Sequence, residues 1–237
     1  MFKNPRHILI IDDDVELATL FVDYLTLEGF RTSAAHSGAE GVEAALHEEL
    51  DLIVLDEAMP GEDGAEVLRR LREKSEVPVL MLTVRDDSPE RIRTLELGAD
   101  DCVRKPCPPR ELVARINAIL RRTTSARAVA SPVVVGPVTI SPAQRSVRSG
   151  EKPIELTGTE FSLFELLARN VGSPISKEEI YPKVLGRPMG PYDRAIDVHV
   201  SSIRHKLAAV IGKSLAIESI RGVGYQLVVR SDEPGAA

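Results

Sequence analysis

The chain has 237 residues, of which 43% are hydrophobic, and its formal net charge is −6. This length fits about two domains, with enough apolar side chains for two modest cores. The chain has only two cysteines, no apolar stretch near the roughly 20 residues of a membrane span, and no signal-peptide pattern at its start. These features argue against a disulfide-bonded scaffold and a membrane partner, and we expect a cytoplasmic protein.

The two halves of the chain differ in charge. Residues 1–122 hold 16 lysines and arginines against 25 acidic residues, a balance of −9. Residues 123–237 hold 14 against 11, a balance of +3. An acidic half and a mildly basic half are expected to meet different partners.

Residues 1–122 alternate five times between a short apolar run and an amphipathic segment. Strict alternation of this kind predicts an α/β domain, a doubly wound (βα)₅ fold with a parallel sheet. The strand candidates that end in polar residues are 7–11, 52–55, 77–82 and 102–104. The expected helices lie near residues 14–28, 38–48, 64–73, 88–97 and 108–121.

The pattern changes after residue 122. Residues 123–131 are small and polar with no apolar period, so we expect a linker. Residues 132–156 are β-like, and Thr157 with Glu160 has the spacing of a capping box at a helix start. The remaining expected elements are helices over 158–170, 176–184 and 192–209 and a hairpin over 216–229. This order predicts an α+β winged helix-turn-helix domain over 132–231, followed by a frayed tail at 232–237.

Polar residues stand at the ends of four apolar runs in the first half. They are Asp12 with Asp13, Asp56, Thr83 and Lys105. In an open α/β sheet the ligand crevice lies outside the carboxyl ends of the strands, so these side chains are expected to converge there. Crowded carboxylates repel one another, and a hard divalent cation such as Mg²⁺ would relieve that repulsion.

This set of side chains predicts a site that accepts a phosphoryl group. The Asp56 carboxylate, exposed by the loop that follows it, would attack phosphorus to give an acyl phosphate. Asp13, Asp56 and the Ala58 carbonyl would hold Mg²⁺. The Lys105 ammonium and the Thr83 hydroxyl would bind the phosphoryl oxygens.

Five short motifs resemble the receiver domain of two-component response regulators of the OmpR/PhoB family. They are Ile11–Asp14 (IDDD), Leu55–Pro60 (LDEAMP), Leu82-Thr83, Gly98–Asp101 (GADD) and Lys105-Pro106. The resemblance implies that a sensor histidine kinase phosphorylates Asp56. It also implies that Asp12 and Asp13 form an acidic Mg²⁺ pocket, and that Thr83 and Lys105 sense the phosphoryl group.

The same resemblance implies a symmetric homodimer that forms on activation. The matching positions are Arg91 with Glu111 and Asp101 with Arg115. Two positions depart from the family pattern: Cys102 stands where an aromatic ring is usual, and Asn117 where a lysine is common. We therefore expect phosphorylation to shift this domain's equilibrium less strongly than in relatives that have the ring.

The second half resembles the DNA-binding domain of the same family, and residues 184–199 are similar to Cpx-type envelope-stress regulators. In helix 192–209 an apolar stripe would face the core and leave the other side for promoter DNA. The resemblance assigns Arg194, Arg204 and Lys206 to phosphates, Ser201 and Ser202 to bases, Val198 to a thymine methyl and Arg221 to the wing contact. Residues 186–192 would meet RNA polymerase.

Two alternatives remain beside a phosphorylation-controlled regulator. One keeps the fold but makes Asp56 vestigial and DNA binding constitutive, a possibility that Cys102 keeps open. The other is a phosphohydrolase of the haloacid-dehalogenase type, which also places Asp-x-Asp, Thr and Lys along a doubly wound sheet. That class needs an acidic pair after the lysine, whereas here Asp100 and Asp101 precede Lys105.

Overall fold

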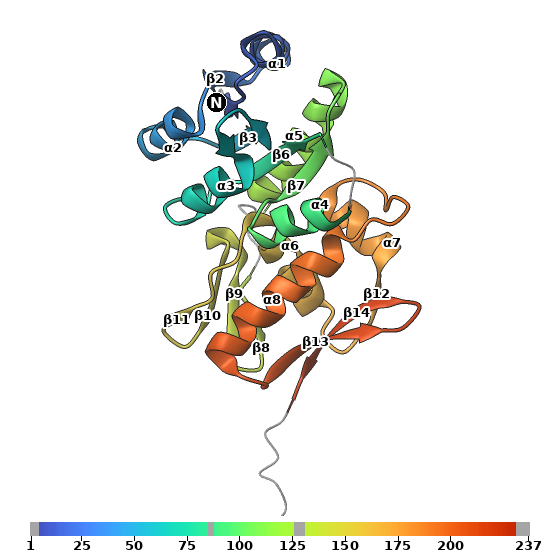
Figure 1. Ribbon diagram of the computed structural model, residues 1–237. Helices are drawn as coiled ribbons and strands as arrows, with labels where there is room; N and C mark the ends of the chain where they lie inside the picture. Colours follow the sequence, from blue (N-terminus) through green and yellow to red (C-terminus); the bar gives the residue numbers. More distant parts are fainter. Residues whose placement is uncertain (1–4, 85–87, 126–130, 231–237) are drawn as a thin grey trace, which may run out of the picture. The chain divides into compact units, whose positions relative to one another are not determined.

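The computed structural model describes residues 5–84, 88–125 and 131–230 (Figure 1). The chain forms two compact units, residues 1–120 and 121–237. Most of the expected linker and the expected tail lie outside the described residues. Within the described part, no helix has the length and apolar character needed to cross a membrane.

The first unit is built on a parallel sheet. Its strands are β1 (His7–Ile11), β2 (Arg31–Ala35), β3 (Leu52–Asp56), β6 (Val79–Thr83) and β7 (Asp101–Arg104). Their order is β2-β1-β3-β6-β7, and each neighbouring pair is parallel. The chain therefore winds outward in one direction from β1 and in the other from β3, which confirms the doubly wound prediction.

Helices connect and cover these strands. They are α1 (Val15–Leu27), α2 (Gly38–His47), α3 (Gly64–Arg72), α4 (Ser88–Glu96) and α5 (Pro109–Ser125). Asp14, Ser37 and Asp63 cap the first three, because each side chain accepts a hydrogen bond from a backbone N–H of the first turn. Helix α5 continues to Ser125, so the prediction that a linker begins at residue 123 is wrong. Residues 123–125 contain no Pro or Gly, and the helix continues through them.

The core on one face of the sheet lies between the strands and helices α1 and α5. It is formed by alternate strand residues and by the inner faces of both helices, including Ile8, Ile10, Val54, Leu80, Leu82, Phe21, Leu25, Ile116 and Ile119. On the other face α2 lies very close to β1, because a Cβ built on Gly41 would come within 2.3 Å of Ile11 Cδ1. Any larger residue at that position would force the Ile11 side chain to move.

A short hairpin, β4 (Ala58–Met59) and β5 (Glu62–Asp63), follows β3. Pro60 and Gly61 form its corner, and the φ angle of Gly61 is +80°, as the third residue of a type II turn requires. Gly64, at the start of α3, lies against the backbone of this loop: an added Cβ would come within 2.4 Å of the Asp56 carbonyl oxygen. The hairpin thus fixes the segment next to Asp56.

The second unit begins with an antiparallel sheet and ends with a wing. Its strands in the first sheet are β8 (Val133–Val135), β9 (Val138–Ser141), β10 (Ser146–Ser149) and β11 (Lys152–Pro153). Helices α6 (Gly158–Arg169) and α7 (Lys177–Ile180), a π-helical segment Tyr181–Leu185 and helix α8 (Ala195–Ile211) follow. A second sheet has the order β12 (Ile175–Ser176), β14 (Gly224–Val229) and β13 (Leu215–Ile220).

These elements confirm the winged helix-turn-helix prediction. The predicted capping box is present, with both the Thr157 and the Glu160 side chains bonded to backbone N–H groups. Helix α8 begins at Ala195, three residues later than expected. The reason is Asp193, whose carboxylate accepts a hydrogen bond from the Ala195 N–H and pairs with Arg187 in the preceding loop. The wing is the hairpin β13–β14 (Figure 1, red).

Candidate functional site

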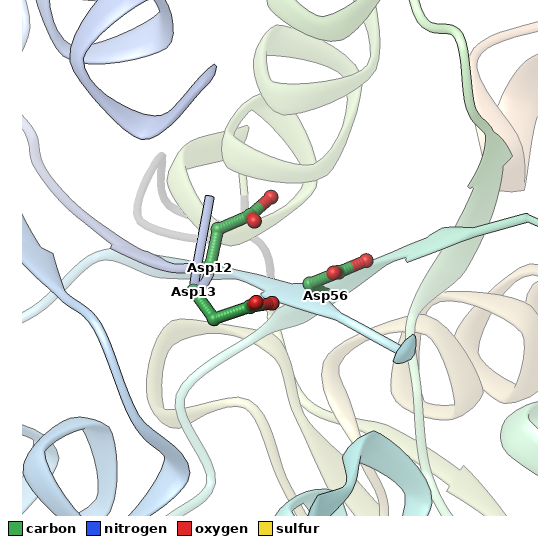
Figure 2. A group of neighbouring side chains, drawn as sticks. All are labelled: Asp12, Asp13 and Asp56. Carbon is green, nitrogen blue, oxygen red and sulfur yellow. The ribbon is translucent and has the colours of Figure 1, made fainter. Parts of the chain in front are cut away.

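Three carboxylates gather at the carboxyl ends of β1 and β3 (Figure 2). Asp12 and Asp13 follow β1, and Asp56 is the last residue of β3. One oxygen from each of the three lies within 4.8 Å of the others. Asp12 is 0% exposed and Asp56 3%, so the expectation that the following loop leaves the Asp56 carboxylate exposed is wrong. The predicted acidic pocket therefore forms from residues more than forty positions apart.

The fold explains why these side chains meet. Strands β1 and β3 are neighbours, and the chain leaves them in opposite directions, so a crevice opens between their ends. Asp14 caps α1 with its side chain, and its own N–H donates to Asp12 Oδ1 at 3.0 Å. The turn into the helix thus fixes the orientation of the Asp12 carboxylate.

Lys105 completes the site from the end of β7. Its Nζ lies 2.8 Å from Asp12 Oδ2 and 2.9 Å from Asp56 Oδ1. The peptide bond between Lys105 and Pro106 is cis. Burial alone would lower the pKa of the Lys105 ammonium, but its hydrogen bonds to Asp12 and Asp56 prevail and raise that pKa. Lys105 is therefore a fixed cation at neutral pH.

The Asp56 carboxyl has the opposite balance. Burial raises its pKa, and the negative charge of Asp12 adds to that effect. Lys105 and a hydrogen bond from the backbone of Ala58 lower it by less. The Lys105 ammonium contacts two of the three carboxylates, so the site keeps an excess of negative charge that a cation would neutralise.

The donor set fits Mg²⁺. All three side chains offer carboxylate oxygens, which are the ligands that a hard divalent cation prefers. Asp12, Asp13 and Asp56 would hold the ion from the two strand ends. The prediction that the Ala58 carbonyl is a further ligand is not tested and stays a prediction.

Thr83 ends β6 and is 5% exposed, and its role beside the phosphoryl group stays a prediction. Its hydroxyl donates a hydrogen bond to Glu57, the residue after Asp56. A second buried hydroxyl, Thr94 in α4, lies 3.5 Å from Glu57 Oε1. Burial raises the pKa of Glu57, and the charges of Glu90 and Asp63 add to it. Sequence analysis missed Glu57; the available signal was an acidic residue directly after the expected nucleophile.

The residues expected at a dimer face lie on α4, β7 and α5. The Arg115 guanidinium is 2.9 Å from Asp101 and 2.7 Å from Glu111, so within one chain it pairs with both. Arg115, Glu111 and Arg91 of α4 line an open cavity of about 370 Å³. The small side chain of Cys102 also lines this cavity, where a larger ring would occupy space. The dimer contacts themselves stay predictions.

The two cysteines differ in accessibility. Cys102 is buried, and Cys107 is partly exposed. Burial raises the pKa of the Cys107 thiol to about 11, and the charge of Glu111 adds to that effect. Very little thiolate is present at neutral pH, so Cys107 is a poor nucleophile.

Three residues that were predicted to contact DNA are accessible. Arg194, just before α8, has a side chain that is 64% exposed and lies 3.7 Å from Asp197. Ser201 is exposed on α8, and Arg221 is exposed at the turn of the wing. Their contacts with DNA stay predictions.

Four other predicted DNA contacts have side chains that are buried or have partners inside the unit, and their contacts with DNA stay predictions. Val198 is only 5% exposed. The Lys206 ammonium lies 2.7 Å from Glu160, which is 2% exposed, and the Ser202 hydroxyl also bonds to that carboxylate. Arg204 donates to the Ile217 carbonyl at 2.8 Å and to Ser219 at 3.0 Å, so it fastens α8 to β13.

The loop between the second and third helices carries a protruding aromatic side chain. Tyr192 is 94% exposed, and its φ angle of +57° is unusual for a residue other than glycine. Its neighbour Asp193 is held by Arg187 and by the Tyr181 hydroxyl, which donates to the Asp193 carbonyl at 2.8 Å. The loop is therefore well anchored. Its contact with RNA polymerase stays a prediction.

Comparison with known proteins agrees with this geometry. Residues 8–117 match the family model of the response regulator receiver domain, and residues 150–227 match that of the transcriptional regulatory protein C terminal. The transcriptional regulatory protein CpxR of Escherichia coli is 40% identical over 230 residues, which cover 94% of this chain and 99% of CpxR.

Two solved structures support the fold. A RitR mutant aligns with a TM-score of 0.76 and 24% identity over 94% of this chain and 98% of its own. The Thermotoga maritima response regulator DrrB, an OmpR/PhoB homolog, aligns with a TM-score of 0.50 and 26% identity over 94% and 99%. The receiver fold with its acidic pocket, the winged helix and the full-length similarity to CpxR together show that this chain belongs to the two-component response regulators of the OmpR/PhoB type.

Proposed function

We propose that this regulator accepts a phosphoryl group on Asp56 from a sensor histidine kinase and, once phosphorylated, binds promoter DNA as a dimer. The arrangement of Asp12, Asp13, Asp56 and Lys105 is the observation that carries the proposal. A DNA-binding regulator of this kind would act in the cytoplasm, where its promoters are.

The chemistry follows from the side chains of the site. An Asp56 oxygen attacks the phosphorus of a phosphohistidine, a P–O bond forms, and the P–N bond to the imidazole breaks. Lys105, held 2.9 Å from Asp56, places its positive charge beside the incoming phosphoryl oxygens. Mg²⁺ bound by the carboxylates would supply the charge neutralisation that lets a dianion approach them. The Thr83 hydroxyl would then donate to the phosphoryl oxygen.

Activation would join two copies through α4, β7 and α5, where Arg91, Asp101, Glu111 and Arg115 lie. Residues 123–237 carry a charge of only +3, so a single copy is expected to bind DNA weakly at physiological salt. Two copies on a direct repeat would raise the affinity because the second contact becomes intramolecular. The exposed Tyr192 loop is then available to RNA polymerase.

A second candidate function is constitutive DNA binding without phosphorylation. The observation that favours it is Cys102, which leaves an open cavity on the expected dimer face in place of a ring. The phosphohydrolase hypothesis gains no such support, because the relatives named above are transcriptional regulators.

Sedimentation of the full chain with Mg²⁺, with and without beryllofluoride, tests the main proposal. Beryllofluoride mimics the phosphoryl group on an aspartate, so we expect a shift from monomer toward dimer that chelation of Mg²⁺ reverses. Asp13→Ala should lower the affinity of the protein for Mg²⁺. Circular dichroism should show that its fold is intact. An equal dimer fraction in all conditions would favour constitutive binding.

A further inference from the structure

Glu57 is fixed by its backbone between the phosphoacceptor strand and its neighbours. Its N–H donates to the Leu82 carbonyl at 2.9 Å, and its carbonyl accepts from the Gly64 N–H at 3.0 Å. Both partners belong to regular elements, β6 and the start of α3. The backbone of Glu57 is therefore fixed one residue after Asp56, and its side chain is half-buried.

The Glu57 carboxylate faces two buried hydroxyls. Thr83 donates to it, and Thr94 lies 3.5 Å from Oε1. Thr83 is 5% exposed and Thr94 2%, so water competes little for these contacts. The Thr94 hydroxyl lies nearer to the Glu90 carbonyl, at 3.0 Å, and of the two hydroxyls Thr83 lowers the pKa of Glu57 more.

We propose that Glu57 is a positioning residue that holds the Thr83 hydroxyl in the unphosphorylated protein and competes with the phosphoryl group for it. A threonine hydroxyl has one proton to donate. That proton goes either to the Glu57 carboxylate or to a phosphoryl oxygen on Asp56, so the two states of Thr83 exclude each other. This inference rests on the function proposed above and adds a residue to its regulation.

The exchange links the site to α4. When Thr83 leaves Glu57, the carboxylate loses its main donor, and Thr94 of α4 is the other hydroxyl within reach. The bonding of one α4 residue therefore depends on whether Asp56 carries a phosphoryl group. By holding Thr83, Glu57 would make the state in which Thr83 bonds to the phosphoryl group less stable. Removing Glu57 would therefore favour that state.

The test is the affinity of the full chain for beryllofluoride in the presence of Mg²⁺, measured by calorimetry. Glu57→Ala removes the competing acceptor and should raise this affinity by roughly tenfold, as expected for one hydrogen bond to a charged group. Glu57→Asp keeps the negative charge but shortens the reach to Thr83, so it should also raise the affinity. In a Thr83→Ala background, Glu57→Ala should produce a much smaller gain, because the shared proton is gone.

Glu66→Ala is the matched control, since Glu66 is an acidic residue on the outer side of α3 that pairs with Arg69. It should leave beryllofluoride affinity unchanged. The inference is overturned if Glu57→Ala raises beryllofluoride affinity equally in the wild-type and Thr83→Ala backgrounds. It is also overturned if Glu57→Asp has the same beryllofluoride affinity as the unchanged chain. Either result would show that only the charge of residue 57 matters. Absence of beryllofluoride binding by the unchanged chain would instead contradict the proposed function.

Discussion

Each unit of this protein buries at least one carboxylate beside a lysine, yet the two clusters differ in charge balance. In the receiver unit Lys105 contacts Asp12 and Asp56, and the more exposed Asp13 adds a third carboxylate at the strand ends. In the winged-helix unit Lys206 faces one, Glu160. The first cluster carries excess negative charge and the second is neutral. Excess negative charge in the first cluster favours the binding of a cation, whereas the second is already paired and can serve the fold alone.

The pKa shifts of the two clusters point in opposite directions for this reason. Burial raises the pKa of Asp56, and its partners do not compensate. Burial would also raise the pKa of Glu160, but Lys206, Ser202 and the Thr157 N–H together lower it. The burial of a carboxylate therefore does not by itself give the direction of its pKa shift, which also depends on its hydrogen-bond donors and cations.

Replacing Asp56 should have the largest effect, because it removes the nucleophile from the unbalanced cluster. We expect Asp56→Asn to abolish acid-labile phosphate incorporation from acetyl phosphate or from a kinase, since an amide does not form an acyl phosphate. Radiolabelled phosphate bound to the protein is the measurement. Glu66→Gln on α3 is a control that should be labelled normally. Full labelling of Asp56→Asn would show that the phosphoacceptor lies elsewhere.

Breaking the balanced cluster should instead destabilise the fold. Lys206→Ala leaves the Glu160 carboxylate, 2% exposed, without its cation. We expect a loss of about 3 kcal/mol in the free energy of unfolding, at the low end for a buried pair because Lys206 is itself 35% exposed. Lys183→Ala breaks a surface pair with Glu179 and should cost less than about 1 kcal/mol. If denaturant titrations gave the same loss in the free energy of unfolding for Lys206→Ala and Lys183→Ala, the difference between the buried and the surface pair would be refuted.

The same pair gives the sign of a pH effect. Because the folded protein lowers the pKa of Glu160, the pair's stabilisation is complete above the ordinary glutamate pKa of 4.5 and is lost as pH falls through the lowered value. The stability difference between the unchanged chain and Lys206→Ala should therefore shrink in acid. A difference that stays constant from neutral pH down to strong acid would contradict this assignment.

How far the sequence predicts this site depends on the geometry involved. Strand ends of a parallel sheet converge, so the meeting of Asp12, Asp56 and Lys105 could be predicted from polar residues after apolar runs. Contacts between side chains on different helices could not. Sequence analysis predicted the buried stripe of α8 but missed a second row at i, i+4 and i+8, Val198, Ser202 and Lys206, in which Ser202 and Lys206 bond Glu160 on α6.

Two adjacent serines on α8 differ in the same way, because one is exposed to solvent and the other has a partner inside the unit. Ser201 is exposed, whereas Ser202 bonds to Glu160. We expect Ser201→Arg to shift the preferred DNA sequence toward guanine at one position by about 1–3 kcal/mol. Ser202→Arg should lower the melting temperature instead, because it places a bulky cation in the Glu160 pair. Selection from a random duplex pool measures the DNA preference, and thermal melting measures the stability. An unchanged DNA motif for Ser201→Arg would show that Ser201 does not contact the bases.

Two arginines of the wing region provide a similar pair with a smaller effect. Arg221 is exposed at the turn, while Arg204 bonds to β13. Arg221→Ala should weaken binding to specific and unrelated duplexes alike and reduce the salt slope by about 1, as for one lost phosphate contact. Arg204→Ala should chiefly reduce stability. A loss of affinity confined to one base position would mean that Arg221 reads sequence.

The smallest expected effect concerns the dimer face of the receiver unit. Cys102 is 4% exposed and lines a cavity of about 370 Å³ together with Arg91, Glu111 and Arg115. Cys102→Tyr would place a ring in that space. A ring that packs differently in the two states of the domain widens the free-energy gap between them, so beryllofluoride should drive dimerisation more completely in the variant.

The measurement is the ratio of dimerisation constants with and without beryllofluoride, compared between the variant and the unchanged chain. A ligand shifts an equilibrium only by its differential affinity for the two states, so a larger ratio in Cys102→Tyr would place the ring within the coupling. Cys107→Ser is the control, because it alters the other thiol outside this cavity's lining. Equal ratios for Cys102→Tyr and the unchanged chain would mean that coupling runs through Thr83 and Glu57, and that the cavity beside Cys102 has no part in it.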